Sequence, residues 1–354
     1  MTGHDSTSPA STPAFETLLA VDAYAEQRQR LNACRFKGGR NGHYESYFVR
    51  ANHPGRPLAF WIRYTIFSPK GNAGGELGEL WVIVFDGETH QVSAAKAELP
   101  FPQCQFDRNG LDVRIGDATL EPGRLEGEVR QGQQHIQWNL TYRHGGEPVH
   151  LLPENLYDTA LPKAKALVAN PMAIFSGHLR VNGEMLYVDH WVGSENHNWG
   201  SKHTDEYAWG QVAGFDNAPD AFLEVATARI KVGPVWTPRM TTLVLRLEDR
   251  EFKLNNLLKA ARAKAHYGYF HWHFDSADDN VRIVGDIQAP REHFVGLNYY
   301  NPPGGSHTCL NCKIAACRLL VQEKGKPDRT LYTASRAAFE ILTDDTGHGV
   351  AVVA

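Results

Sequence analysis

The stretch "LAFWIRYTIFSPKGNAGGELGELWVIVFD", residues 58–86, favours one fold class over the others. It holds two runs rich in aromatic and β-branched residues, 58–67 and 78–86, and a segment with Pro and several Gly separates them. Short runs of this kind that are joined by turn residues are typical of antiparallel strands in a hairpin. The stretch therefore predicts β-structure in which consecutive strands are neighbours.

The same pattern continues along the chain on both sides of this stretch. Runs such as "HYESYFVRA" and "HIQWNLTYR" precede residue 152, and runs such as "AFLEVATARI", "MTTLVLRLED" and "CKIAACRLLV" follow residue 172. Regular short strands with turn segments between them indicate an antiparallel sandwich or barrel, and they argue against alternating strand and helix units. The sequence thus predicts an all-β fold.

Two segments depart from this alternation and suggest domain boundaries. "VDAYAEQRQRLNA", residues 21–33, contains helix formers and no Gly or Pro, and a leader rich in Ser, Thr and Pro precedes it. "PENLYDTALPKAKALVANP", residues 153–171, loses the alternation and is bracketed by prolines. We predict a leader and short helix over 1–34, a first β-domain over 35–152, a linker over 153–171 and a second β-domain over 172–354.

Composition excludes several classes of function. The formal net charge is −4 and the isoelectric point is about 6.5, so the chain lacks the basic surface of a nucleic-acid-binding protein. No apolar run has the length of a membrane helix, which still allows peripheral contact with a bilayer surface. Five cysteines without a secretory signal predict reduced thiols and a cytoplasmic location.

The densest group of polar and aromatic residues is "VDHWVGSENHNWGSKHTDEYAWGQ", residues 188–211. In an extended chain, successive side chains alternate between the two faces. One face of the first part would then hold Asp189, Trp191, Glu195, His197 and Trp199, and one face of the second part His203, Tyr207 and Trp209. Gly193 and Gly200 are expected to mark bends, which can reset this register.

Carboxylates, imidazoles and indoles on one face suit the protonation of a carbon–carbon double bond. The acid must be a carboxyl group that burial keeps neutral near pH 7, and Glu195 or Asp189 could fill that role. Aromatic rings such as Trp191, Trp199 and Trp209 would stabilise the resulting cation by about 0.5 to 2 kcal/mol each. His197 could act as the base or position a water molecule.

Two other interpretations use the same residues. Glu195, His197 and His203 are the ligand types of a catalytic zinc site, but they lack the spacing of a helical zinc motif, so we predict neither metal nor cofactor. Alternatively, the asparagines and glycines form a turn, the indoles fill a barrel, and the histidines bond to the backbone.

A second polar and aromatic strand is "AHYGYFHWHFD", residues 265–275. Its alternation places Tyr269 and His271 on a face with polar tips, opposite a face that carries Phe and Trp. These two residues are candidates for substrate binding if that face lines a pocket.

At "ENHNWGSKHTDEYAWGQVAGFD", residues 195–216, the chain resembles the AttH-like and carotenoid 1,2-hydratase group, with tocopherol cyclase-like and Diels–Alderase relatives. The resemblance is carried by "HNWG", by the His three residues later and by "YAWGQ". It implies two tandem lipocalin-like β-barrels, hydrophobic ligands such as isoprenoids or polyenes, and reactions that include water addition and ring closure.

The resulting expectation is a cofactor-independent hydratase, dehydratase or cyclase that acts on a hydrophobic unsaturated small molecule in a barrel pocket. A carrier of lipophilic ligands without catalysis remains the alternative, since an aromatic-lined barrel binds apolar molecules without any chemistry. The sequence leaves the substrate and the oligomeric state open.

Overall fold

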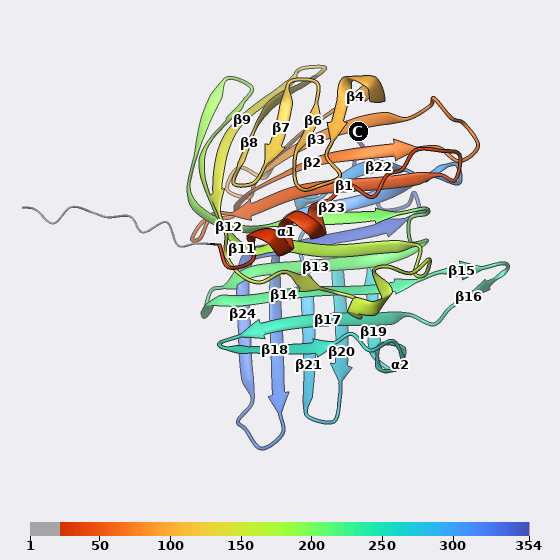
Figure 1. Ribbon diagram of the computed structural model, residues 1–354. Coiled ribbons are helices and arrows are strands. Elements are labelled where there is room, and N and C mark those ends of the chain that lie inside the picture. Colours follow the sequence, from red (N-terminus) through yellow and green to blue (C-terminus); the bar gives the residue numbers. More distant parts are fainter. Residues whose placement is uncertain (1–21, 354) are drawn as a thin grey trace, which may run out of the picture.

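The computed structural model describes residues 22–353, and its two large antiparallel sheets confirm the predicted all-β fold class. Sheet A has twelve strands and sheet B has ten, and a separate two-stranded hairpin projects from one side. In Figure 1 sheet A lies above sheet B, with the helix α1 in front of the region where they meet. The Ser-, Thr- and Pro-rich leader lies outside the described residues.

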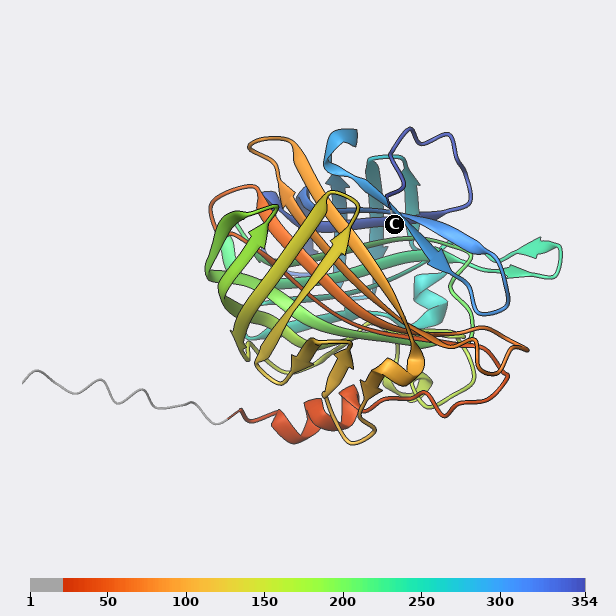
Figure 2. The ribbon, with the colours of Figure 1, turned by 90° about the horizontal axis from the view of Figure 1, so that it is seen from above.

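Sheet A is a strongly curved sheet that nearly closes into a barrel, because β4 near one edge also contacts β8 and β9. Figure 2 shows its strands wrapping around a common interior, with α1 beside one end. In sheet order the strands are β4 (Gln91–Pro100), β3 (Leu77–Asp86), β2 (Leu58–Ser68), β1 (His43–Asn52), β12 (Glu184–Gly200), β11 (Ala164–Val181), β9 (Gln134–Arg143), β8 (Arg124–Gln131), β7 (Ala118–Glu121), β6 (Val113–Ile115) and β5 (Cys104–Phe106), and β10 (Val149–His150) pairs with β11.

The hairpin predicted from residues 58–86 is present as β2 and β3, which pair from Leu58 with Asp86 to Phe67 with Leu77. Successive side chains of β2 alternate between two environments. Phe60 and Tyr64 belong to the cluster inside sheet A, whereas Trp61 packs with residues of sheet B. Both faces of this strand are therefore buried, which explains its nearly continuous run of apolar residues.

The chain passes from sheet A to sheet B near residue 200, and not at the linker expected over residues 153–171. That segment contains the 3₁₀ turn η2 (Glu154–Leu156) and the start of β11, and residues 172–200 continue in sheet A. The strand β12 pairs with β1 on one side and with β11 on the other, so it is an internal strand of sheet A and not an edge strand. Three register shifts in the β11–β12 ladder explain why the sequence alternation is lost there.

Sheet B follows sheet A in the chain and packs against its outer face. In sheet order the strands are β18 (Arg250–Leu254), β17 (Met240–Leu247), β14 (Ala218–Arg229), β13 (Glu206–Phe215), β24 (Arg329–Thr343), β23 (Ser306–Glu323), β21 (Val281–Gln288), β20 (His271–Ala277) and β19 (Lys264–Gly268), and β22 (Val295–Tyr300) pairs with β23. The separate hairpin consists of β15 (Lys231–Val232) and β16 (Val235–Trp236).

The helices are short. The predicted N-terminal helix is α1 (Ala25–Asn32), which is held to β11 by a hydrogen bond from Arg28 Nε to the carbonyl of Ala169. The second helix, α2 (Leu257–Ala260), is capped by the Asn256 side chain. Two further 3₁₀ turns are η1 (Phe101–Gln103) and η3 (Arg291–His293).

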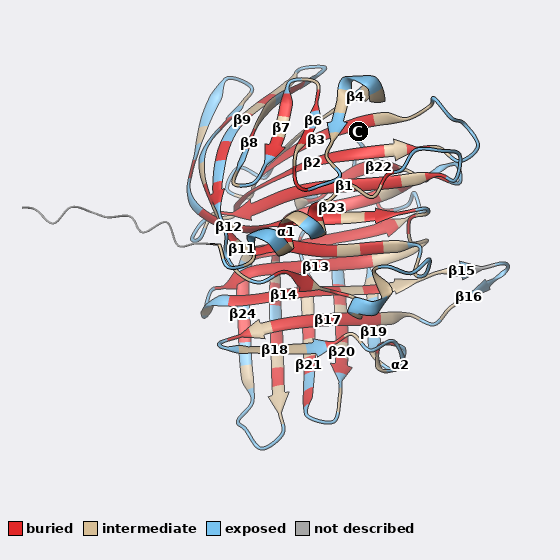
Figure 3. Ribbon diagram, in the orientation of Figure 1, coloured by how far each residue is buried: buried red, intermediate tan, exposed pale blue. Residues whose placement is uncertain are grey.

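Buried residues concentrate on the strands and above all where the two sheets meet, whereas the hairpin tips are exposed (Figure 3). The interior of sheet A is occupied by large side chains that are at most 1 % exposed, among them Tyr47, Phe60, Tyr64, Phe175 and Trp191. The interior of sheet B is similarly occupied by Trp272, Phe274 and Phe339. The sheets therefore bury three layers of side chains, one inside each sheet and one between them.

Candidate functional site

The motif over residues 188–211 connects the two sheets. Its first part is the end of β12 in sheet A, and its second part is the start of β13 in sheet B. The domain bounds predicted from the sequence put the whole motif in the second β-domain. The two faces of β12 instead contribute to two different environments, one inside sheet A and one between the sheets.

The face of β12 inside sheet A carries four of the five residues expected to share a face: Trp191, Glu195, His197 and Trp199 are all buried. Asp189 does not join them, because its side chain is 88 % exposed and pairs with His190. The backbone of His190 has a φ of 54°, which interrupts the alternation after Asp189. Asp189 therefore lacks the burial that would keep a carboxyl group neutral.

Glu195 lies at the end of sheet A that α1 covers. Its carboxylate accepts hydrogen bonds from Asn32 Nδ2 and from the Tyr142 hydroxyl, both at 2.5 Å. Burial, reinforced by the adjacent carboxylate, raises the pKa of Tyr142 well above its usual value. A small cavity of about 40 Å³ adjoins Glu195, and its lining includes Asp22, Arg28, Asn32 and His144.

His197 lies next to this site and forms a buried pair with Glu45 of β1. The two side chains are fully buried, and 2.8 Å separates His197 Nε2 from Glu45 Oε1. The other ring nitrogen, Nδ1, lies 2.9 Å from the carbonyl of Leu31, and the ring stacks on Tyr47. Both ring nitrogens of His197 already have a protein partner, which argues against the role of base that the sequence suggested.

The pKa of Glu45 reflects these contacts. Burial alone would raise it, but the hydrogen bonds from His197 and His43 hold the pKa well below its usual value. The same carboxylate accepts the backbone N–H groups of Arg35 and Phe36. Glu45 and His197 therefore fix the segment after α1 to sheet A.

The opposite face of β12 forms a polar layer between the sheets, which we call the inter-sheet layer. Ser194 Oγ donates to Gln211 Oε1 at 2.7 Å, and Gln211 Nε2 donates to Asn196 Oδ1 at 2.9 Å. Arg50 Nε of β1 donates to Gln211 Oε1 at 2.6 Å, and Arg50 is fully buried. Gln211, the last residue of the motif, thus joins the two sheets.

Glu224 of β14 is the most unusual acid of the inter-sheet layer. Its carboxyl oxygens accept hydrogen bonds from Trp209 Nε1 and Gln211 Nε2, both at 2.8 Å. Burial raises the pKa of Glu224 to about 7, although these two donors oppose the shift. Near neutral pH the side chain is therefore present both as an acid and as a carboxylate.

A buried cation, Lys313, shares the Trp209 side chain with this acid as a neighbour. The Lys313 ammonium donates to Glu340 at 2.7 Å and to Asn311 at 2.6 Å. It also lies 5.6 Å from the centre of the Trp61 ring and 5.4 Å from that of Trp209. Burial lowers the pKa of Lys313, and the Glu340 carboxylate opposes that effect. The indoles of the inter-sheet layer thus already surround a positive charge.

Three nitrogen donors of the inter-sheet layer have no hydrogen-bond partner in the described part of the chain: Trp61 Nε1, Trp81 Nε1 and Arg63 Nε. Arg63 and Trp81 are cross-strand neighbours in β2 and β3. The Arg63 guanidinium lies 4.3 Å from the ring centre of Tyr299, which contacts Trp81 edge to face. Buried donors without partners are rare, so this region could bind a molecule that carries oxygen acceptors.

The remaining predicted site residues lie in several places. His203 is buried, stacks on Tyr44 at 3.8 Å, and has a pKa held well below its usual value by burial and by the nearby Arg63 cation. Tyr207 reaches Glu340 at 3.5 Å and so joins Trp209 in the inter-sheet layer. Tyr269 packs against Phe270, and His271 is exposed and pairs with Asp286 at 3.4 Å, away from that layer.

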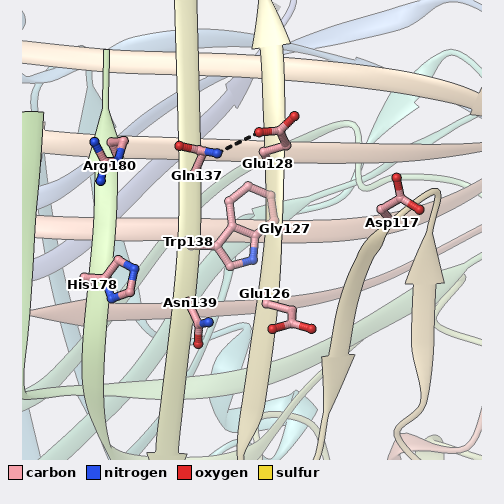
Figure 4. A pocket seen from close by; sticks show the side chains of 9 residues that line it. All are labelled: Asp117, Glu126, Gly127, Glu128, Gln137, Trp138, Asn139, His178 and Arg180. Carbon is pink, nitrogen blue, oxygen red and sulfur yellow. Dashed lines mark hydrogen bonds between the residues drawn. The ribbon is translucent and has the colours of Figure 1, made fainter. Parts of the chain in front are cut away.

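An open depression of about 540 Å³ lies on the outer face of sheet A (Figure 4). Its lining includes the carboxylates of Asp117, Glu126 and Glu128, together with His178 and Arg180. Gln137 donates to Glu128 at 2.8 Å. This lining is charged and largely solvated, so it does not suit a hydrophobic substrate.

Sequence reasoning missed Glu45, Glu224, Glu340 and Lys313. The available signal was a lone charged residue inside an apolar strand, as in "AFLEVATA" for Glu224 and "CKIAAC" for Lys313. Such residues are rarely buried without a partner, which could have marked them as members of a buried network.

The known proteins that resemble this chain are distant from it in sequence. No protein-family profile matches the chain. Two uncharacterized proteins from two strains of Mycobacterium tuberculosis are each 23 % identical to it over 282 residues, covering 78 % of this chain and 80 % of the relative.

Solved structures share the fold at low sequence identity. They include a candidate AttH from Nitrosomonas europaea, which has a TM-score of 0.51 at 14 % identity. The matched region covers 87 % of this chain and 96 % of that protein. Kievitone hydratase from Nectria haematococca has a TM-score of 0.53 at 12 % identity and covers 86 % of this chain and 89 % of its own. CghA, solved with Sch210972, has a TM-score of 0.54 at 10 % identity, with coverage of 90 % and 95 %. These neighbours confirm, at the level of fold, the resemblance to the AttH-like hydratase group.

Two further findings concern metal and membrane. Among residues 22–353, no three His, Cys, Asp or Glu side chains lie together in a way that could hold a metal ion. Neither helix of that region has the length and hydropathy of a membrane-spanning segment.

Proposed function

We propose that the protein is a hydratase, dehydratase or cyclase that acts on a hydrophobic unsaturated small molecule, such as an isoprenoid or polyene, and uses no cofactor. The observation that carries this proposal is the Glu224 carboxyl group, whose pKa is raised to about 7 and which lies against the Trp209 indole. A general acid works best when its pKa is near the working pH. The fold neighbours, one of which is a hydratase by name, are consistent with this class of reaction.

The proposed reaction begins when the Glu224 carboxyl transfers its proton to one carbon of the double bond. Positive charge then develops on the other carbon, where the rings of Trp61 and Trp209 can stabilise it as they stabilise the Lys313 ammonium. In hydration a water molecule adds to the cation and its proton returns to the Glu224 carboxylate. In cyclisation a second double bond attacks the cation, and a carbon next to the new cationic centre loses a proton to the Glu224 carboxylate.

Substrate binding would use the free donors of the inter-sheet layer. We place the apolar part of the substrate against Trp61 and Trp209, and a carbonyl or hydroxyl oxygen within reach of Arg63 and Trp81. Glu195 is the second candidate for the acid, because it is buried beside a small cavity. Asp189 is not retained, since it is exposed.

We also propose that the protein works in the cytoplasm. All five cysteines are free, and Cys309, Cys312 and Cys317 are buried, as expected for thiols in a reducing compartment. Peripheral contact with a bilayer would suit the hydrophobic substrate.

The test begins with native mass spectrometry of protein purified from its host, which identifies the ligand that it retains. Turnover of that ligand is then followed in D₂O, where protonation of the alkene places one deuterium on carbon. We expect Glu224→Gln to lower the rate by about 100-fold or more, whereas Asp189→Asn should keep the wild-type rate.

Three outcomes would contradict parts of this proposal. Full activity of Glu224→Gln together with loss in Glu195→Gln would move the acid to the cavity under α1. Full activity in both variants would exclude either residue as the acid. A ligand that is retained and released unchanged by the wild-type protein would favour the carrier function.

A further inference from the structure

One side of sheet B combines exposed apolar and basic side chains. The β15–β16 hairpin projects from the molecule in both views, and α2 lies on the same side (Figures 1 and 2). The exposed fractions are 65 % for Val235, 37 % for Trp236, 36 % for Leu257 and 77 % for Leu258. These are four of the ten exposed large apolar side chains among the described residues, so they are concentrated here.

The strand register places the two segments at the same end of β17. The hairpin ends just before β17 begins at Met240. The neighbouring strand β18 ends at Leu254, which pairs with Leu243 near the start of β17, and α2 follows directly at Leu257. We call this surface the hairpin–α2 edge, comprising residues 229–239 and 257–268.

The charge of this edge is opposite to that of the whole chain. Its two segments contain Arg229, Lys231, Arg239, Lys259, Arg262 and Lys264 and no acidic residue, although the formal net charge of the chain is −4. Arg229 and Lys259 pair with Glu206 and Asp279. Among the described residues, the exposed Lys231, Arg262 and Lys264 have no carboxylate within ion-pair distance, so they are available to an external anion.

Trp236 connects the apolar and the charged groups of this edge. The Arg229 guanidinium lies 4.3 Å from the centre of its ring, and the Lys231 ammonium lies 5.9 Å away. An indole flanked by basic side chains is typical of protein segments at the boundary between lipid headgroups and acyl chains.

We propose that the hairpin–α2 edge docks on the surface of an anionic lipid bilayer. Val235, Trp236 and Leu258 enter the headgroup boundary, and Lys231, Arg262 and Lys264 contact the lipid phosphates. The hairpin projects, and a projecting tip enters a fluid layer without needing a partner of complementary shape. The unpaired positive charge selects anionic lipid. This inference does not depend on the reaction proposed above.

The experiment is co-sedimentation of the full chain with vesicles of phosphatidylcholine alone and of phosphatidylcholine with about a quarter phosphatidylglycerol. We expect at least about tenfold tighter binding to the anionic vesicles at low salt, since each basic side chain near such a surface adds to the attraction. Binding should weaken as salt screens these charges. The double variant Trp236→Ser with Leu258→Ser should lose at least about tenfold in affinity.

The matched control is Tyr187→Ser, which removes an exposed aromatic ring, 73 % exposed, from sheet A. It should bind vesicles as the wild type does, and circular dichroism and thermal unfolding should show that all variants fold. Equal binding to neutral and anionic vesicles would contradict the role of charge. If Tyr187→Ser lost as much affinity for vesicles as the double variant, the membrane contact would not lie at the hairpin–α2 edge. If the wild-type protein bound neither kind of vesicle, the proposal would be overturned.

Discussion

Glu45 and His197 form a fully buried pair in which 2.8 Å separates the carboxylate oxygen from the ring nitrogen Nε2. The residues are 152 positions apart in the chain. Their strands β1 and β12 are direct neighbours, and Tyr47 lies opposite His197 in the register. The pair therefore joins the first strand of sheet A to the last and also holds the chain that follows α1.

We expect Glu45→Gln to lower the free energy of unfolding by about 1–3 kcal/mol, because an amide nitrogen in place of one carboxylate oxygen cannot accept the buried hydrogen bonds from His197 and from the backbone N–H groups of Arg35 and Phe36. The pKa of Glu45 is lowered, so its stabilisation is fully present above the usual value of 4.5 and is lost as the pH falls further. Urea unfolding should thus show a large difference from wild type at pH 7 and a smaller one in acid. Glu184→Gln, at an exposed position, is the control. If both variants changed the free energy of unfolding by the same small amount, the stabilising role of Glu45 would be contradicted.

The sequence predicted the strands well and the contacts between sheets poorly. The alternation in residues 58–86 specifies β2 and β3 because pairing partners are close in the chain and the turn residues lie between them. Asp189 was placed on the wrong face, since the positive φ of His190 leaves no mark in a pattern of polar and apolar residues. Glu224 was overlooked because its environment is built from β13, β14 and Arg50, which only the packing of the sheets brings together.

Glu224 gives a prediction for the dependence of stability on pH. Its pKa is raised from 4.5 to about 7 in the folded protein, so its contribution to stability is fully present below pH 4.5 and is lost as the pH rises through 7. Glu224→Gln remains neutral and avoids this loss. Between pH 4.5 and 8 its stability should gain about 3 kcal/mol relative to wild type. Urea unfolding across this range measures the difference, and a constant offset between the two proteins would contradict the raised pKa.

The Tyr142 hydroxyl gives a prediction for the site under α1. It donates to Glu195 at 2.5 Å, so Tyr142→Phe leaves a buried carboxylate oxygen without its donor. We expect the free energy of unfolding to fall by about 1–3 kcal/mol. The same substitution at the exposed Tyr187 should have almost no effect in chemical denaturation, and equal stability of the two variants would show that the hydrogen bond is unimportant.

Gly193 gives the last prediction, because β1 and β12 pair there in an unbroken register and approach each other closely. A Cβ atom there would lie 1.8 Å from the carbonyl oxygen of Arg50 and 2.6 Å from the Cα atom of Ala51. Both are backbone atoms of a central strand, so Gly193→Ala must separate the strands that carry the Glu45–His197 pair. We expect a loss of about 3 kcal/mol or more in the free energy of unfolding. Gly55→Ala is the matched control, since a Cβ atom there has no neighbour within 4 Å. Comparable thermal unfolding of the two variants would mean that β1 and β12 are not held at this spacing.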